Sequence, residues 1–174
     1  NQNIYLDDLT AHHALQVMRV QVKDQFIVFN GDGFNYKVEV ISVEKKKLKI
    51  NIISKDENHS ESQTKITLIQ SLSTNEKMDW IIQKATELGV NKIVPIYSTR
   101  SIIKLDSTRA DKKLIHWQQV LISACEQSGR SRIPQIYKPI NFIQALENPE
   151  LNTYSFCHWS PINDYILEND VEDS

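Results

Sequence analysis

The chain has 174 residues, which is enough for one large domain or two small ones. Hydrophobic residues make up 40% of it, an ordinary fraction for a globular protein, and no apolar run approaches the ~20 residues that a membrane-spanning helix needs. Cys125 and Cys157 are the only cysteines, which argues against a disulfide framework or a zinc site and fits a reducing compartment. We therefore expect a cytoplasmic protein with no membrane partner and no metal.

The net charge of −2 conceals a strong asymmetry along the chain. Residues 76–138 carry 11 Lys and Arg against 6 Asp and Glu, a balance of +5, whereas residues 139–174 carry no Lys or Arg and 7 Asp and Glu, a balance of −7. A basic middle segment suits the phosphates of a nucleic acid. A solvated helix surface has the same composition, so charge alone leaves both interpretations open.

Residues 1–60 have the pattern of a small β-rich domain. A short helix is expected over residues 11–19 and an apolar strand over residues 26–29. The Asn-Gly-Asp-Gly sequence at residues 30–33 predicts a tight turn, because these residues tolerate the positive φ that such turns need. Alternating apolar and polar residues between 38 and 52 indicate further short antiparallel strands, typical of a barrel or a sandwich.

The period changes after a polar stretch at residues 55–63, which we expect to be a linker. A second domain is expected over residues 64–174, beginning with a strand at residues 66–69. Residues 73–76 match a capping box, Ser-x-x-Glu, in which two side chains satisfy the free N–H groups of a helix start. Apolar residues at helical spacing then predict a helix over residues 78–88.

The rest of the chain repeats the strand–helix order. Strands are expected at residues 93–96, 133–137 and 154–157, a helix over residues 111–128, and a short helix capped by Asn141. A strand–helix–strand unit implies a parallel sheet with a right-handed crossover. The second domain is therefore predicted to be α/β.

Four polar residues gather where the longer helix of the second domain ends: Glu126, Gln127, Arg130 and Arg132. Cations near a helix C-terminus interact favourably with the helix dipole, which would explain Arg130 without any function. An acid there is mildly unfavourable, so the dipole does not explain Glu126. Because the arginine fork suits phosphate and carbonyl oxygens, this group is the leading candidate for chemistry or for RNA contact.

Other candidates have weaker support. Lys77 and Lys84 are seven residues apart and share a helix face, and Lys84 could pair with Glu87 on the surface. Arg19 is a further cation that could approach RNA. Trp80 is expected to pack rather than to stack on a base.

Three segments of the chain resemble the ribosomal RNA small subunit methyltransferase E family. They are residues 76–90, residues 100–117 and residues 124–134 with the sequence Ala-Cys-Glu-Gln-Ser-Gly-Arg-Ser-Arg-Ile-Pro. A weaker pattern over residues 12–31 also fits. The resemblance covers residues 4–139, which is most of the chain.

The resemblance implies an N-terminal PUA-like β-barrel for RNA over residues 1–60, and the N-terminal part of a SPOUT-type α/β domain over residues 64–174. In the family this second domain contains a trefoil knot, binds S-adenosylmethionine, forms homodimers and methylates N3 of a uridine in ribosomal RNA of the small ribosomal subunit. By this resemblance Glu126, Arg130 and Arg132 are expected to be catalytic. The RNA-binding residues are then expected to be Arg19, Lys77, Lys84 and Gln127.

The chain also departs from the family. Neither the family's Gly-Pro-Glu-Gly-Gly cofactor loop nor its Leu-Arg-x-Glu-Thr segment occurs in it. The cofactor-binding segment and the knot are therefore expected to be absent from these 174 residues, which alone should not methylate RNA. The alternative is a non-catalytic RNA-binding module that has no cofactor site.

Overall fold

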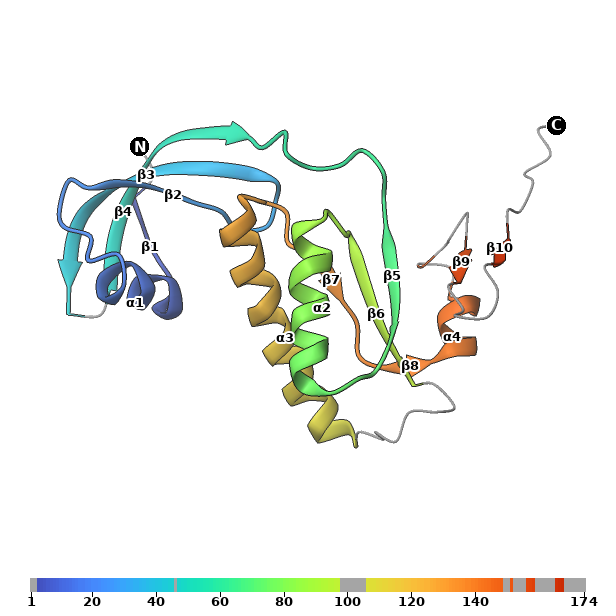
Figure 1. The fold of residues 1–174 in the computed structure, drawn as a ribbon. Helices are drawn as coiled ribbons and strands as arrows, with labels where there is room; N and C mark the ends of the chain where they lie inside the picture. Colours follow the sequence, from blue (N-terminus) through green and yellow to red (C-terminus); the bar gives the residue numbers. More distant parts are fainter. Residues whose placement is uncertain are drawn as a thin grey trace.

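The computed structural model describes residues 3–45, 47–97, 106–148, 151, 156–158 and 165–167. These ranges form two units joined by an extended segment (Figure 1). The first unit contains β1 (Asn3–Tyr5), α1 (Asp8–Gln16), β2 (Gln25–Val28), β3 (Phe34–Glu44) and β4 (Lys47–Glu57). The second contains β5 (Thr67–Ser71), α2 (Asn75–Glu87), β6 (Lys92–Tyr97), α3 (Ser107–Ser128), β7 (Gln135–Ile136), β8 (Ile140–Asn141), α4 (Phe142–Glu147), β9 (Phe156–His158) and β10 (Tyr165–Leu167).

The first unit is an antiparallel sheet with α1 packed on one face. Its strand order is β1-β4-β3-β2, and among the described residues this hydrogen-bonded path does not close on itself. The predicted alternation is confirmed, because Val38, Val40, Leu48 and Ile50 are all buried in one cluster with two alanines of α1. The β3–β4 register shifts at two points, and such bulges bend the paired strands.

Three boundaries of the first unit differ from those expected. The helix begins three residues earlier, at Asp8, because Oδ1 of Asp7 accepts a hydrogen bond from the backbone N–H of Thr10 at 3.0 Å and so caps it. It ends at Gln16, and Arg19 has a φ of 53°, outside the helical range. The linker also begins late, since residues 55–57 still pair with β3.

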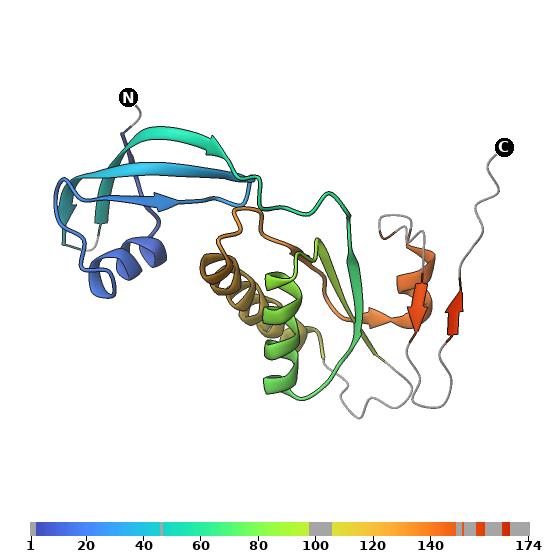
Figure 2. The same cartoon turned by 45° about the horizontal axis from the view of Figure 1, so that its top comes forward.

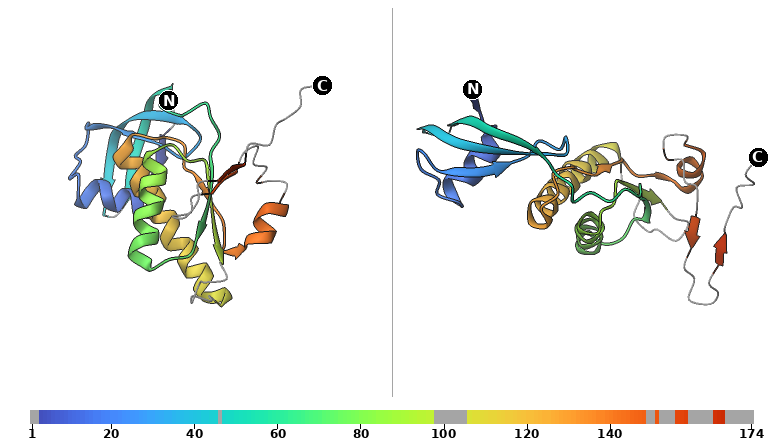
Figure 3. Two further views of the ribbon diagram at one scale, coloured as in Figure 1. Left: turned by 45° about the vertical axis from the view of Figure 1, so that its right-hand side comes forward. Right: turned by 90° about the horizontal axis from the view of Figure 1, so that it is seen from above.

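The second unit is built on a parallel sheet, as predicted. β6 is central: it pairs in parallel with β5 on one side and with β7 and β8 on the other. Helices α2 and α3 cover one face of this sheet and α4 lies against the other (Figure 3). Successive strand residues point to opposite faces, so Ile93 packs under α2 and α3 while Val94 packs against α4.

Helix α2 starts differently from the prediction. Its N-cap is Thr74, which makes no side-chain capping hydrogen bond, so the expected capping box of Ser73 with Glu76 is wrong. The helix starts one residue too late for Glu76 to occupy the third helical position that a capping box needs. Its end is as expected, because Gly89 takes a φ of 95° directly after it.

Helix α3 is longer than predicted. It begins at Ser107 rather than residue 111, because the side chain of Asp106 caps it by accepting from the N–H of Arg109. It ends as predicted at Gly129, which is left-handed with a φ of 71°. The next predicted strand shrinks to β7, and the cap at Asn141 is confirmed as a full capping box with Gln144. The strand expected at 154–157 is β9, whose first two expected residues lie outside the described ranges.

Candidate functional site

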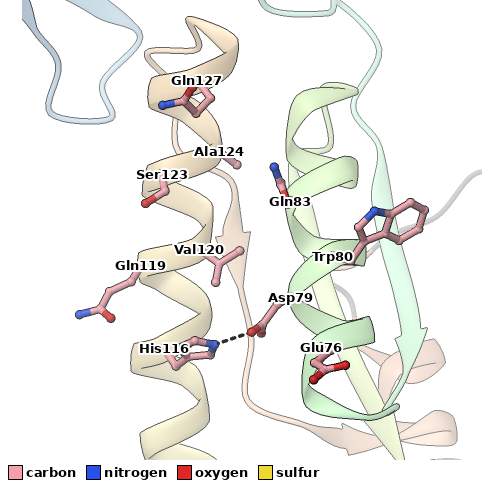
Figure 4. Close-up of a pocket in the computed structure, with 10 residues that line it drawn as sticks. All are labelled: Glu76, Asp79, Trp80, Gln83, His116, Gln119, Val120, Ser123, Ala124 and Gln127. Carbon is pink, nitrogen blue, oxygen red and sulfur yellow. Dashed lines mark hydrogen bonds and ion pairs between the residues drawn. The ribbon is translucent and has the colours of Figure 1, made fainter.

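A groove of about 510 Å³ runs along the outer seam between α2 and α3 (Figure 4). Its lining comes from both helices, and most of the residues that supply it have polar side chains: Glu76, Asp79, Trp80, Gln83, His116, Gln119, Val120, Ser123, Ala124 and Gln127. The helical period explains this lining. Met78 and Ile82 turn into the core, so their neighbours Asp79 and Gln83 face the seam.

A carboxylate–imidazole pair closes one end of the groove. Nε2 of His116 lies 2.8 Å from Oδ2 of Asp79, which joins α3 to α2 (Figure 4). The other oxygen of this carboxylate, Oδ1, is buried and has no hydrogen-bond partner among the described residues. Nε1 of Trp117, the residue after the histidine, is buried in the same state. Such groups cost about 1–3 kcal/mol each, so Asp79 in the groove and Trp117 in the core beneath it are both held at some cost in stability.

Trp80 corrects an expectation. It was predicted to pack, yet it is 62% exposed and belongs to the lining of the groove. Its indole projects from the side of α2 that is turned away from α3 (Figure 4). Trp117 is 1% exposed and fills the core beneath α2. Residue 80 lies two positions after the core residue Met78, which turns it about 200° around the helix and away from the sheet.

A second polar centre lies where the two units meet, and it contains Arg130. The guanidinium is 5% exposed and makes a bidentate ion pair with Glu61, at 3.0 Å from Nε to Oε1 and 2.7 Å from Nη2 to Oε2. Nη1 donates to the carbonyl oxygens of Thr86 at 2.8 Å and Val90 at 3.0 Å. The cation therefore caps the end of α2 rather than that of its own helix.

The other residues predicted at the end of α3 are placed differently. Arg132 is exposed, and its guanidinium lies so close to Gly33 that a Cβ there would stand 2.6 Å from Nη2. Gln127 lines the groove, and Glu126 is exposed beside it in sequence. The structure thus brings Arg130 and Arg132 to the junction of the units and Gln127 to the seam of α2 and α3.

The remaining predicted RNA contacts are spread over both units. Lys77 is exposed on α2, and Lys84 donates to Glu87 at 2.7 Å, which confirms the expected surface pair. Arg19 follows α1 in the first unit. The catalytic and RNA-binding roles of all these residues stay predictions.

Ionisable groups in both units have perturbed pKa values with clear physical causes. Burial raises the pKa of the Cys125 thiol to about 11, against the smaller opposing effect of the nearby Arg130 charge. The hydrogen bond from Lys84 holds the pKa of Glu87 below its ordinary value of 4.5. The hydrogen bond from Tyr36 does the same for Asp32, whose ordinary value is 3.8.

Two of the important contacts were not found from the sequence. Glu61 lies in a polar stretch without a period, so nothing marked it as the partner of a residue 69 positions away. The pairing of Asp79 with His116 spans 37 positions and depends on how α2 packs on α3. The helical phase of both residues, next to core positions, is the one signal that could have indicated it.

Within the described ranges, no three His, Cys, Asp or Glu side chains gather as a metal site would require. Among the helices that the structure describes, none combines the length and the apolar character of a membrane span. Both glycines of the second unit end helices.

Comparison with known proteins gives the family. A family model described as an RNA methyltransferase PUA domain matches residues 6–53, and one described as an RNA methyltransferase domain matches residues 60–169. Ribosomal RNA small subunit methyltransferase E of Bacillus subtilis (strain 168) is 37% identical over 136 residues, which are 78% of this chain. The chain belongs to the ribosomal RNA small subunit methyltransferase E family.

Solved structures agree with this assignment. A ribosomal RNA small subunit methyltransferase E from Neisseria gonorrhoeae, bound to S-adenosyl methionine, is 39% identical and matches 84% of this chain with a TM-score of 0.79. A methyltransferase from Legionella pneumophila, in complex with bound SAM, is 34% identical and matches 85% with a TM-score of 0.81. The fold is therefore a PUA-like domain followed by a SPOUT methyltransferase domain, as the sequence predicted.

The chain is shorter than the family members it matches. It spans 53% of the Bacillus subtilis protein, 60% of the Neisseria gonorrhoeae chain and 62% of the Legionella pneumophila chain. The bound S-adenosyl methionine belongs to the Neisseria gonorrhoeae and Legionella pneumophila structures.

Proposed function

We propose that this chain is the RNA-binding and sheet-forming part of a cytoplasmic, homodimeric enzyme that transfers a methyl group from S-adenosylmethionine to uracil N3 in small-subunit ribosomal RNA. The observation that supports this most is the combined match of both units, in order, to a family member that is bound to S-adenosyl methionine. The PUA-like domain would hold RNA, and the SPOUT domain would bring the target base to the cofactor.

The described residues do not by themselves fit the cofactor. The family's cofactor loop is rich in glycine, whereas Gly89 and Gly129, the two glycines of the second unit, both serve as helix ends with φ values of 95° and 71°. We therefore assign no cofactor residue on this part of the chain.

The groove of α2 and α3 suits an unpaired base better than a phosphate. Two carboxylates, Glu76 and Asp79, line one end of it, and they would repel a phosphate. The ring of Trp80 offers a face for stacking, and the amide of Gln127 can both donate to and accept from a base edge. Nε2 of Gln83 already donates to Glu87 at 3.0 Å, so its amide oxygen is the group offered to a base. Single-stranded RNA is recognised through such contacts.

The backbone of the RNA would instead meet the exposed cations. Lys77 and Arg132 are exposed, and neither forms an ion pair with a side chain in the described ranges. Lys84 is already paired with Glu87, so we expect its share to be smaller. Arg19 would extend the contact surface into the PUA-like domain.

Uracil N3 lies on the Watson–Crick edge and carries a proton, so the target base has to be unpaired and the proton has to leave. Glu126 is an exposed carboxylate that could accept this proton or orient Arg132. Arg132 could stabilise the negative charge that spreads onto the neighbouring carbonyl oxygens. Arg130 can do neither directly, because four of its five N–H groups are bound within the chain.

The runner-up function is an RNA-binding module without catalysis. The observation that favours it is the absence of a glycine-rich cradle among the described residues of the second unit. In that case the PUA-like domain and the groove would bind RNA, and no methyl group would be transferred.

Nucleoside mass spectrometry separates the two. The full-length gene product is incubated with labelled S-adenosylmethionine and undermethylated small ribosomal subunits, and the digested RNA is searched for labelled N3-methyluridine. Its appearance would support the methyltransferase, and its absence together with tight RNA binding would support the module. The intact mass of the purified protein, measured on the same sample, shows whether it exceeds the 20.2 kDa of these residues.

A further inference from the structure

Three segments meet at the junction of the two domains. They are the β2–β3 turn, the segment that follows β4, and the loop that follows α3, and Figure 2 shows the turn beside the end of α3. The N–H of Gly33 donates to the carbonyl of Ser131 at 3.1 Å, and that of Asn58 donates to the carbonyl of Gly33 at 3.0 Å. The amide Nδ2 of Asn58 donates to the carbonyl of Gly129 at 2.8 Å. Hydrogen bonds therefore join the segment between the domains to the β2–β3 turn and also to the end of α3.

The ion pair of Glu61 with Arg130 is the strongest of these ties. Both side chains are nearly enclosed, with 14% and 5% exposed, and both oxygens of the carboxylate accept a hydrogen bond from the fork. A pair of this kind adds little stability over a well-packed apolar pair, because taking two charges out of water is costly. The pair instead favours a single relative position of Glu61 and Arg130, because a shifted carboxylate would leave a buried cation without its partner.

The same loop carries the exposed cation of the proposed RNA surface. Arg132 lies two residues after Arg130, and its guanidinium rests on Gly33 of the PUA-like domain, where a Cβ would stand 2.6 Å away. Ile133 rests in the same way on Gly31, where a Cβ would stand 3.2 Å away. The placement of Arg132 toward RNA therefore depends on the placement of the β2–β3 turn.

We infer that Glu61 and Arg130 are positioning residues that fix the PUA-like domain on the SPOUT domain, so that RNA held by the first domain meets Arg132 and the groove of the second. The benefit of this arrangement to RNA binding rests on the proposed function, whereas the fixed arrangement of the two domains does not. Domains joined by a polar segment ordinarily move relative to one another. Here the fork of Arg130 ties the segment between the domains to the end of α2, through Glu61 on one side and the carbonyls of Thr86 and Val90 on the other.

Distance distributions between spin labels test the inference on the chain itself. Labels are placed at Val17→Cys in the PUA-like domain and Ile115→Cys on α3, since both positions are well exposed and neither belongs to the junction. Cys157 is replaced by Ser in this background, and Cys125 is protected by its burial. The test variants are Glu61→Gln and Arg130→Lys, and the matched control is Asp111→Asn, which removes the exposed ion pair with Lys138.

We expect a single narrow distribution in the parent chain and in Asp111→Asn, and a distribution at least about twofold broader in Glu61→Gln and Arg130→Lys, because the domains regain relative motion. Circular dichroism shows that each variant is folded. If both variants of the ion pair unfold, Asn58→Ala serves instead. It removes an exposed contact of the same junction and is expected to broaden the distance distribution less.

Two results would overturn the inference. One is a broad or two-peaked distribution in the parent chain, and the other is an unchanged distribution in the folded variants, which would leave the pair a purely stabilising role. Neither measurement contains RNA or cofactor, so a negative result leaves the proposed methyl transfer untouched. A narrow parent distribution with a failed methylation assay would conversely reject the function alone.

Discussion

The junction at Arg130 and the groove beside Trp80 both bring polar side chains together, but the two regions differ in whether those side chains are already paired. At the junction, four N–H groups of one arginine are bound by Glu61 and two carbonyls inside the chain. In the groove, the ring of Trp80 is 62% exposed, and Gln127 on the α3 side is exposed as well. Buried and paired groups hold the protein together, whereas exposed ones remain available to a partner. An arginine in a functional-looking motif is therefore not by itself a substrate contact.

The largest effect is expected from Arg130→Ala. It removes the partner of the nearly buried carboxylate of Glu61 and one donor each from the carbonyls of Thr86 and Val90, which should lower the free energy of unfolding by about 3–5 kcal/mol. Urea unfolding followed by circular dichroism measures this change. Arg109→Ala is the matched control, because its ion pair with Asp106 is largely exposed, and we expect it to cost less than about 1 kcal/mol. Equal costs for the two variants would refute the difference between them.

Trp80→Ala tests whether the groove, unlike the junction, contributes to RNA binding rather than to stability. We expect its free energy of unfolding to change by less than about 0.5 kcal/mol, and its affinity for a single-stranded fragment of small-subunit ribosomal RNA to fall by about 1–3 kcal/mol, as for a lost stacking contact. Fluorescence anisotropy at fixed salt measures the affinity. Ile115→Ala, exposed on α3 but outside the groove, should bind as the parent does. A stability loss without an affinity loss would make Trp80 a packing residue after all.

Cys125 is buried next to the junction, where its thiol contacts the carbonyl of Arg132. Its titration tests whether water is excluded there. Its pKa is raised by burial from 9.0 to about 11, so the folded chain keeps a proton that the unfolded chain loses. The contribution of this residue to stability is then fully present below pH 9.0 and lost as the pH rises through about 11. Cys125→Ala should lack this alkaline decline. Unfolding curves of the two chains between pH 8 and 11 that stay parallel would show that the thiol is not buried.

The smallest effect is expected from Glu87→Gln. Lys84 lowers the pKa of this carboxyl below 4.5, so its contribution is present above pH 4.5 and disappears as the pH falls through the lowered pKa. The melting temperatures of the parent and the variant should differ slightly at pH 7 and converge on acidification. Adding salt should shrink the difference at pH 7, because the pair is partly exposed. A difference that grows toward low pH would contradict the assignment.

The order of elements could be predicted from local signals. The helix ends at Gly89 and Gly129 follow from a backbone conformation that glycine adopts readily, and the parallel sheet follows from a strand–helix–strand order. The start of α2 could not, since the Ser73 pattern competes with a start one residue later and the two differ by a small free energy.

The candidate site was harder to predict because its partners are distant in sequence. The segment of residues 124–134 was singled out, and Gln127 does line the groove. The burial of Arg130, however, depends on Glu61 and on where α2 ends. The exposure of Trp80 depends on which side of α2 faces the sheet. Its residue type alone predicted a buried position.

Hydrogen–deuterium exchange of the chain, free and with a small-subunit ribosomal RNA fragment, tests the contrast between the two regions most directly. We expect the amides around Glu61 and Arg130 to be protected already in the free chain, and RNA to add protection along α2 and α3 at the groove and at the loop of Arg132. Fast exchange around Arg130 in the free chain, or added protection that avoids the groove and the loop, would contradict it.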